Sequence, residues 1–282
     1  MSTYYVLVDF IGADQASPSR YNRRDVLRVV RPHLEELRRY GCRRLIECTP
    51  NFLGRDPRLL KQLAGDTGIE VWTNTGLYGA GQNYKFLPAY ARQETAEQLA
   101  ARWIEEATRG VDGIRPRFIK IGIGQTSLGE WDRKLVRAAA ITSRATDFTI
   151  ASHTPTGAAA AEQLEILTAE RVAPAKFVWV HAQNEKDHNF HRKLAEAGAW
   201  VEFDGIGPKS AYWHRDCIEF MGEAGLLGRT LISQDAGWYH VGEPGGGDFR
   251  PYTYIYTHFG AGLDDGLKHQ LLVQNPEAAF GK

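Results

Sequence analysis

Apolar residues recur along the chain with two different periods. In residues 23–40 they recur every three or four positions, which places them on one face of an α-helix. The apolar positions on that face are Val26, Val30, Leu34 and Leu37. Asn22 can cap the start of this helix, and Gly41 follows its end. Elsewhere the apolar residues form short continuous runs, which is the pattern of strands buried on both faces.

The two patterns alternate over the whole chain. Eight segments read as buried strands: residues 4–10, 43–48, 69–73, 117–124, 148–152, 177–180, 200–203 and 230–233. Helical patterns follow them at residues 23–40, 57–64, 95–109, 131–143, 157–167, 187–197 and 211–224, and again after the Gly-rich loop 241–248. Eight such units in about 250 residues predict a TIM (β/α)8 barrel, which we expect to form a single domain over residues 1–282. A doubly wound open sheet is the competing fold, but no G-x-G-x-x-G motif follows the first strand.

Composition and charge restrict the function classes. The chain has 34 basic and 34 acidic residues, so its net charge is zero and no nucleic-acid partner is expected. No apolar run approaches the ~20 residues of a membrane span, and no signal peptide is evident. The three cysteines, Cys42, Cys48 and Cys217, have no C-x-x-C spacing, which fits a reducing compartment. We therefore expect a cytoplasmic protein that acts on a small molecule.

A lysine lies in the middle of the fourth predicted strand. In Phe118-Ile119-Lys120-Ile121-Gly122, Lys120 stands between apolar residues, and a buried amine is costly unless it is neutralised or paired. A lysine at this position can extend to solvent or pair with a carboxylate. Alternatively, Lys120 belongs to a functional site.

Polar residues at the ends of the predicted strands favour a functional site. Active sites of TIM barrels lie at the carboxyl ends of the strands. These ends carry Lys120, His153, His181 and Asp235, with gaps of 33, 28 and 54 residues. The gaps correspond to about one, one and two βα units of ~31 residues each. Imidazoles and a carboxylate suit a divalent metal such as zinc, although a single histidine can equally be a hydrogen-bonding residue and Asp235 a helix cap.

The sequence gives less indication of a functional role for the other histidines. We expect three of them to be solvated on helices, and these are His33, His191 and His269. His188 and His214 are expected at helix edges.

Five segments of the chain resemble one enzyme family. FIKIG, ASHTPTG, VHAQNEKD, ISQDAGWY and NPEAAF are similar to the phosphotriesterase-like branch of the amidohydrolase superfamily, over residues 7 to 280. The resemblance implies a TIM barrel with a pair of divalent metals at the carboxyl ends of the strands. It also implies that Lys120 is a carboxylated lysine that bridges the metals, and that His153 and His181 bind the more exposed one. A neutral buried amine can take up carbon dioxide and become an anionic ligand.

The resemblance implies roles for two further residues, and at one motif the sequence differs from the family pattern. It implies that Asp235 binds the buried metal and carries a proton, and that Tyr78 lies over the substrate carbonyl as in lactonases of the family. The family begins its first strand with His-x-His, but Thr3 and Tyr5 stand at those positions here. Three explanations remain open. The chain can carry foreign residues at its start, it can have lost one metal, or it can be a relative that does not hydrolyse.

These observations predict a metal-dependent hydrolase of an ester-like bond, in the first instance a lactone and in the second a phosphotriester. Zinc is the expected metal, with manganese or cobalt as alternatives and one or two ions bound. The loops 74–94, 204–212 and 238–252 are expected to shape the pocket. Their candidate substrate-binding residues, beside Tyr78, are Lys209, Trp238, His240 and Arg250. A catalytically inactive barrel that binds a small molecule or partner, and a hydrolase of amides, are the alternatives. By resemblance the chain is expected to form a homodimer.

Overall fold

The computed structural model describes residues 3–281. Its strands are β1 (Thr3–Val8), β2 (Arg44–Glu47), β3 (Glu70–Trp72), β4 (Asn74–Thr75), β5 (Phe118–Gly122), β6 (Ile150–His153), β7 (Phe177–Val180), β8 (Trp200–Phe203), β9 (Thr230–Ile232) and β10 (Ala236–His240). Every ladder between neighbouring strands among these residues is parallel. Parallel neighbours require crossover connections, which are provided mostly by helices.

The strands form a ring of eight positions, which we call staves and number in chain order. β3 and β4 form one stave, because only Thr73 separates them; β3 pairs with β2 and β4 with β5. β9 and β10 form the eighth stave; β9 pairs with β8 and β10 with β1. The hydrogen-bonded orders β10-β1-β2-β3 and β4-β5-β6-β7-β8-β9 therefore meet in these two shared staves. The prediction of a TIM barrel is confirmed.

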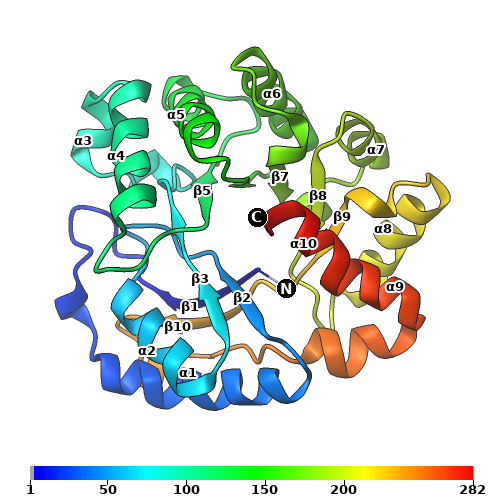
Figure 1. Cartoon of the computed structure of the whole chain (residues 1–282), viewed down its shortest axis with the longest axis horizontal. Coiled ribbons are helices and arrows are strands. Elements are labelled where there is room, and N and C mark those ends of the chain that lie inside the picture. The colour runs from blue at the N-terminus through cyan, green and yellow to red at the C-terminus, as the bar shows by residue number, and fades with distance from the viewer. Residues whose placement is uncertain (1–2, 282) are drawn as a thin grey trace.

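Helices surround the ring of strands (Figure 1). Within the described residues the α-helices are α1 (Arg23–Arg39), α2 (Pro57–Thr67), α3 (Ala89–Gln93), α4 (Ala96–Arg109), α5 (Glu130–Thr146), α6 (Gly157–Ala169), α7 (His188–Glu196), α8 (Ala211–Glu223), α9 (Asp265–His269) and α10 (Asn275–Phe280). The predicted cap of α1 is present, because the Asn22 side chain accepts a hydrogen bond from the backbone N–H of Arg24 at 2.9 Å. Thr95 and Gln98 form a capping box at the start of α4.

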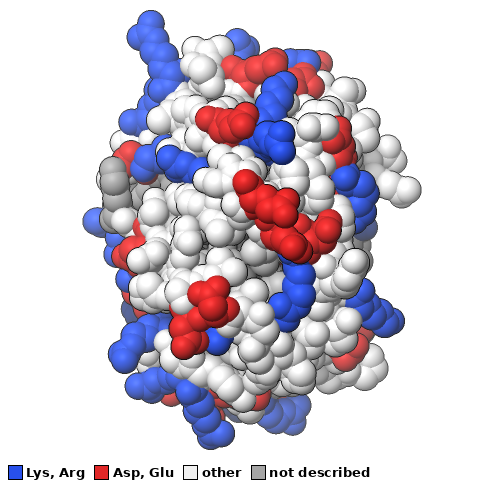
Figure 2. Space-filling model, turned by 90° about the vertical axis from the view of Figure 1, so that its right-hand side faces the viewer, with Lys and Arg blue, Asp and Glu red and all other residues white. Residues whose placement is uncertain are grey.

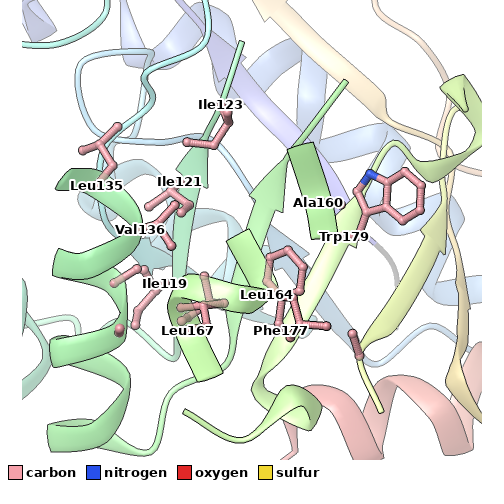
Figure 3. Close-up of a cluster of buried hydrophobic side chains, with 14 of the residues drawn as sticks. Ile119, Ile121, Ile123, Leu135, Val136, Ala160, Leu164, Leu167, Phe177 and Trp179 are labelled. Carbon is pink, nitrogen blue, oxygen red and sulfur yellow. The ribbon is translucent and has the colours of Figure 1, made fainter. Parts of the chain in front are cut away.

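Strand alternation determines which side chains enter the barrel. Ile119, Ile121 and Ile123 point outward toward Leu135 and Val136 of α5, as Figure 3 shows. Because successive side chains of a strand point to opposite faces, Lys120 points into the barrel interior. The interior holds a separate apolar cluster from several staves, which includes Phe118, Val178, Trp200 and Leu231.

The C-terminal helix closes one end of the barrel. Phe280 of α10 contacts the Phe118 ring edge-on at 5.6 Å between centroids, near the amino end of β5. Thr149 Oγ1 donates to the backbone carbonyl of Ala279 at 2.6 Å, and Asn275 Nδ2 donates to two backbone carbonyls at the start of stave 8 at 2.7 Å each. In Figure 1 the C-terminus accordingly lies over the centre of the ring. The opposite end, where the strands end, is the mouth of the barrel.

Two predicted loops contain regular structure. The segment 74–94, expected to be a loop, includes β4 and α3. The residues after the eighth predicted strand form β10, whose five residues carry a Gly and alternate less clearly between apolar and polar than the other strands. β10 exists because β1 offers it a parallel partner, from Tyr4 opposite Ala236 to Val8 opposite His240. Such pairing depends on tertiary contacts more than on local propensity.

Charged side chains of both signs are interspersed on the surface shown in Figure 2, as the balanced composition suggests. Among the described residues, no helix has the length and apolar character needed to cross a membrane.

Candidate functional site

Lys120 lies at the centre of the barrel. Its side chain is 0% exposed, and its Nζ has no hydrogen-bond partner among the described residues. An amine in this position is costly unless it is neutral, paired or bound to another group. Lys120 therefore does not extend to solvent, which was one of the two possibilities left open by the sequence.

His153 lies at the end of β6 and faces two groups in the mouth. Its Nδ1 is 3.1 Å from the Tyr78 hydroxyl, and its ring centroid is 4.4 Å from that of His181. Burial lowers the pKa of His153 well below its ordinary value, and the positive character of His181 and Lys120 adds to this effect. His153 is therefore neutral near pH 7, the form in which imidazole binds metals.

Gly122 allows Tyr78 to reach this position. A Cβ atom at Gly122 would lie 2.3 Å from the Tyr78 ring, so only glycine leaves room for the ring over the end of β5.

His181 is held by a carboxylate from the neighbouring stave. Its ring Nδ1 donates to Asp204 Oδ1 at 2.6 Å, and its backbone N–H donates to Asp204 Oδ2 at 3.1 Å. Burial lowers the pKa of His181, but the Asp204 carboxylate outweighs burial and the net shift is upward. With Nδ1 engaged by Asp204, Nε2 is the nitrogen left to face a ligand, the arrangement found where carboxylates orient metal-binding histidines.

Gln183 holds Asp204 in turn. Its Nε2 donates to Asp204 Oδ1 at 2.6 Å, and its Oε1 accepts from the Asp204 backbone N–H at 3.0 Å. His214, on α8, donates from Nε2 to the Asp204 backbone carbonyl at 2.5 Å. These contacts fix the loops after β7 and β8 against each other, so the orientation of His181 depends on residues that do not face the mouth.

Asp235 lies between β9 and β10 in a left-handed backbone conformation, with φ of 47°. Its backbone carbonyl accepts from Trp238 Nε1 at 3.0 Å and from Arg250 at 3.3 Å. Burial raises the pKa of its carboxyl to about 6, with repulsion from Asp204 as the next cause. A carboxyl with this pKa can accept and release a proton near neutral pH.

An aromatic rim surrounds the mouth on the side of staves 1 and 8. The Phe10 ring is 40% exposed and lies 5.7 Å from the Trp238 ring and 5.8 Å from the His240 ring. The Arg250 guanidinium stacks on Trp238 at 5.2 Å. Three of the predicted substrate-binding residues thus lie together, whereas Lys209 is exposed on the loop after β8 and makes no hydrogen bond or ion pair with another described residue.

Tyr5 projects into the mouth from β1, at one of the two positions where the resemblance predicts histidine. Its side chain is 6% exposed, and its ring lies 5.0 Å from Trp238. Burial raises the pKa of Tyr5 well above its ordinary value, and the nearby carboxyl of Asp235 adds to the rise. The phenol is therefore neutral.

Two expectations about other histidines were wrong. His191 and His214, expected to be solvated or at a helix edge, are both completely buried. Each hydrogen-bonds backbone carbonyls that follow strands, His191 to Ala182 and His214 to Asp204. A buried imidazole satisfied in this way fixes loops, and helical periodicity alone does not reveal it. His269 is exposed as expected.

The donors of the mouth are of the kind that hold a divalent cation. They comprise two imidazoles, the carboxyl of Asp235 and the unpartnered amine of Lys120. Within residues 3–281, no group of three His, Cys, Asp or Glu side chains is arranged to hold a metal ion, so the histidines need a further ligand of another type. The Lys120 Nζ is buried without a hydrogen-bond partner in this range, and a cation held beside it would explain that position. The donor set therefore fits a cation.

Asp204, Gln183 and the orientation of Tyr5 were not anticipated. A signal for Asp204 was available, because it directly follows the strand Trp200–Phe203, where site residues of a barrel are expected. Gln183 carried no signal, since its role arises only from contact with Asp204.

The sequence matches the model of the phosphotriesterase family over residues 4–280. The phosphotriesterase homology protein of Escherichia coli K12 is 26% identical over 270 residues, which cover 92% of this chain and 90% of that protein. An aryldialkylphosphatase of Saccharolobus solfataricus is 27% identical over 196 residues, covering 68% of this chain and 61% of that protein. A solved structure described as organophosphate hydrolysis activity engineered from a weak promiscuous lactonase template superposes with a TM-score of 0.86 at 24% identity, covering 99% of this chain and 94% of that one.

The family match spans nearly the whole chain and agrees with the ring of eight staves and with the polar mouth. The chain therefore belongs to the phosphotriesterase family and is a hydrolase that acts on small molecules.

Proposed function

We propose that the protein is a metal-dependent hydrolase of a carboxylic ester bond, with a lactone as the preferred substrate. The single observation that supports this most is the pair of imidazoles of His153 and His181, whose centroids are 4.4 Å apart, near the buried amine of Lys120 that has no hydrogen-bond partner among the described residues. These three residues would hold a divalent cation, with Lys120 in its carboxylated form, and Asp235 would carry the proton. A cation held there supplies Lewis-acid polarisation and lowers the pKa of water.

Tyr78 and Asp235 perform the remaining chemistry in this proposal. The Tyr78 hydroxyl reaches His153 Nδ1 at 3.1 Å, so it can donate a hydrogen bond to a carbonyl oxygen placed beside that histidine. Burial raises the pKa of Tyr78 above its ordinary value, which keeps the phenol protonated for that task. Asp235, with a pKa of about 6, takes a proton from the attacking water and passes it to the ring oxygen as the bond between that oxygen and the carbonyl carbon breaks.

The test measures turnover and metal content together. The full chain, loaded with zinc in the presence of bicarbonate, is assayed on lactones, aryl esters and phosphotriesters. His181→Ala should abolish turnover and lower metal content, while the exposed His258→Ala serves as the matched control and should change neither. A zinc-, manganese- or cobalt-loaded protein without turnover on the panel would refute the proposal and favour a binding function.

Phosphotriester hydrolysis is the second candidate. It is favoured by the similarity to the aryldialkylphosphatase of S. solfataricus, at 27% identity. The same donors and the same Tyr78 hydroxyl would face a phosphoryl oxygen. If kcat/KM for a phosphotriester exceeds that for every lactone tested, phosphotriester hydrolysis becomes the first candidate and lactone hydrolysis the second.

A further inference from the structure

The donors of the mouth are unevenly distributed around the ring. Staves 4, 5, 6 and 8 supply Lys120, His153, His181 and Asp235, and Asp204 of stave 7 holds His181. Stave 1 lies opposite stave 5 in a ring of eight, and its inward-facing residues include Val8, which is apolar, and Tyr5. The candidate metal ligands therefore come from staves 4 to 8, whereas stave 1 presents a phenol.

The neighbours of Tyr5 do not complete a second cation site. Cys48, at the end of β2, is completely buried, and burial raises the pKa of its thiol well above the ordinary value. Zinc takes at least three protein ligands, which are thiolates, imidazoles or carboxylates, whereas this part of the mouth offers one thiol and one phenol. The remaining ligands, two imidazoles and the Lys120 group, are the three protein ligands that one catalytic zinc ion takes beside a water molecule.

We infer that the mouth holds one divalent cation, on the side of staves 4 to 6, and that the Tyr5 phenol occupies the opposite half as a catalytic hydrogen-bond donor. This inference rests on the proposed function and specifies the composition of its site. The substrate would lie between the cation and Tyr5, with a developing oxyanion or the leaving oxygen facing the phenol. No covalent bond to Tyr5 forms, and its proton stays on the phenol.

The position of Tyr5 is fixed in advance of substrate binding. Its ring packs against Trp238 at 5.0 Å, and its backbone carbonyl accepts from the Tyr252 hydroxyl at 2.8 Å. The parallel ladder with β10 places Tyr5 opposite Gly237. A donor that is already oriented in a buried site stabilises developing charge without reorganisation, and removing such a donor costs roughly 10²–10³ in kcat in enzymes where it has been tested.

The number of cations is the first test. The full chain is saturated with Mn²⁺ and bicarbonate, freed of excess metal and analysed for manganese per chain, with an electron paramagnetic resonance spectrum of the same sample. One ion per chain with the spectrum of an isolated Mn²⁺ supports the inference. Two ions per chain with an exchange-coupled spectrum overturn it while leaving the proposed function intact, and absence of bound metal overturns both.

The second test addresses the phenol. Tyr5→Phe keeps the ring and its packing, and we expect kcat to fall at least ~10-fold with KM little changed and metal content unaltered. Tyr4→Phe is the matched control, because Tyr4 points to the outer face of the same strand, where its hydroxyl donates to the Tyr252 carbonyl at 3.2 Å. Tyr4→Phe should leave kcat within ~2-fold. A Tyr5→Phe protein that is folded by circular dichroism and retains the original kcat overturns the catalytic role.

Discussion

A buried carboxyl outside the mouth makes the stability of the protein depend on pH. Glu47, at the end of β2, is 1% exposed. Its Oε1 accepts from the backbone N–H groups of Val6 at 3.3 Å and Thr49 at 3.2 Å, and from the Thr49 hydroxyl. Its Oε2 has no hydrogen-bond partner among the described residues. Burial outweighs these bonds and raises the pKa of Glu47 to about 7.

The sign and size of the effect follow from this pKa. The carboxyl binds its proton more tightly in the folded protein (pKa about 7) than in the unfolded chain (4.5), so the stabilisation from Glu47 is complete below the unfolded value and is lost as pH rises toward 7. Between pH 5 and pH 8 the loss amounts to about 2.5 kcal/mol. For 282 residues with an unfolding entropy of about 2.1 cal/mol/K each, this corresponds to ~4 °C in Tm.

Glu47→Gln removes the ionisation and keeps the acceptor at Oε1. The difference in Tm between this variant and the original protein, measured by circular dichroism at pH 5 and at pH 8, should shift by ~4 °C in favour of the variant at the higher pH. Other titrating groups are common to both proteins and cancel in the difference. Glu219→Gln, at an exposed position on α8, controls for the chemical change. A Glu47→Gln difference that stays constant within ~1 °C between the two pH values would refute the reasoning.

Other contacts give further predictions. Asp204→Asn should weaken zinc affinity roughly 10–100-fold in competition with a chelator, while Asp216→Asn, which alters the partner of His188 away from the mouth, should change it less than ~2-fold. Gln183→Met removes both bonds to Asp204 and should weaken zinc affinity by a smaller factor, roughly 3–10-fold; no change would show that Asp204 holds its position without help. Phe280→Ala should lower the free energy of unfolding in urea by about 3–5 kcal/mol, and a loss below ~1 kcal/mol would mean that α10 does not seal the barrel.

The sequence by itself determined the architecture and the direction of the central lysine. Eight alternating units specify a barrel, because each strand is apolar on both faces and each helix has one apolar face. Isoleucines on both sides of Lys120 determine its direction, since alternate side chains of a strand face opposite sides of the sheet. His153, His181 and Asp235 were found in the sequence because active sites of TIM barrels lie at the carboxyl ends of the strands. Their binding of a metal stays a prediction.

Only the tertiary structure decided how the mouth is composed. Asp204 follows a strand end, but its contacts with His181 and Gln183 join loops that are about 20 residues apart in the sequence, so no local pattern encodes these contacts. β10 forms because β1 lies beside it, and Tyr5 faces the candidate ligands because the ring closes between staves 8 and 1. Local periodicity determines the face on which a side chain lies, whereas closure of the ring determines which faces meet, and the chemistry of the site depends on that second step.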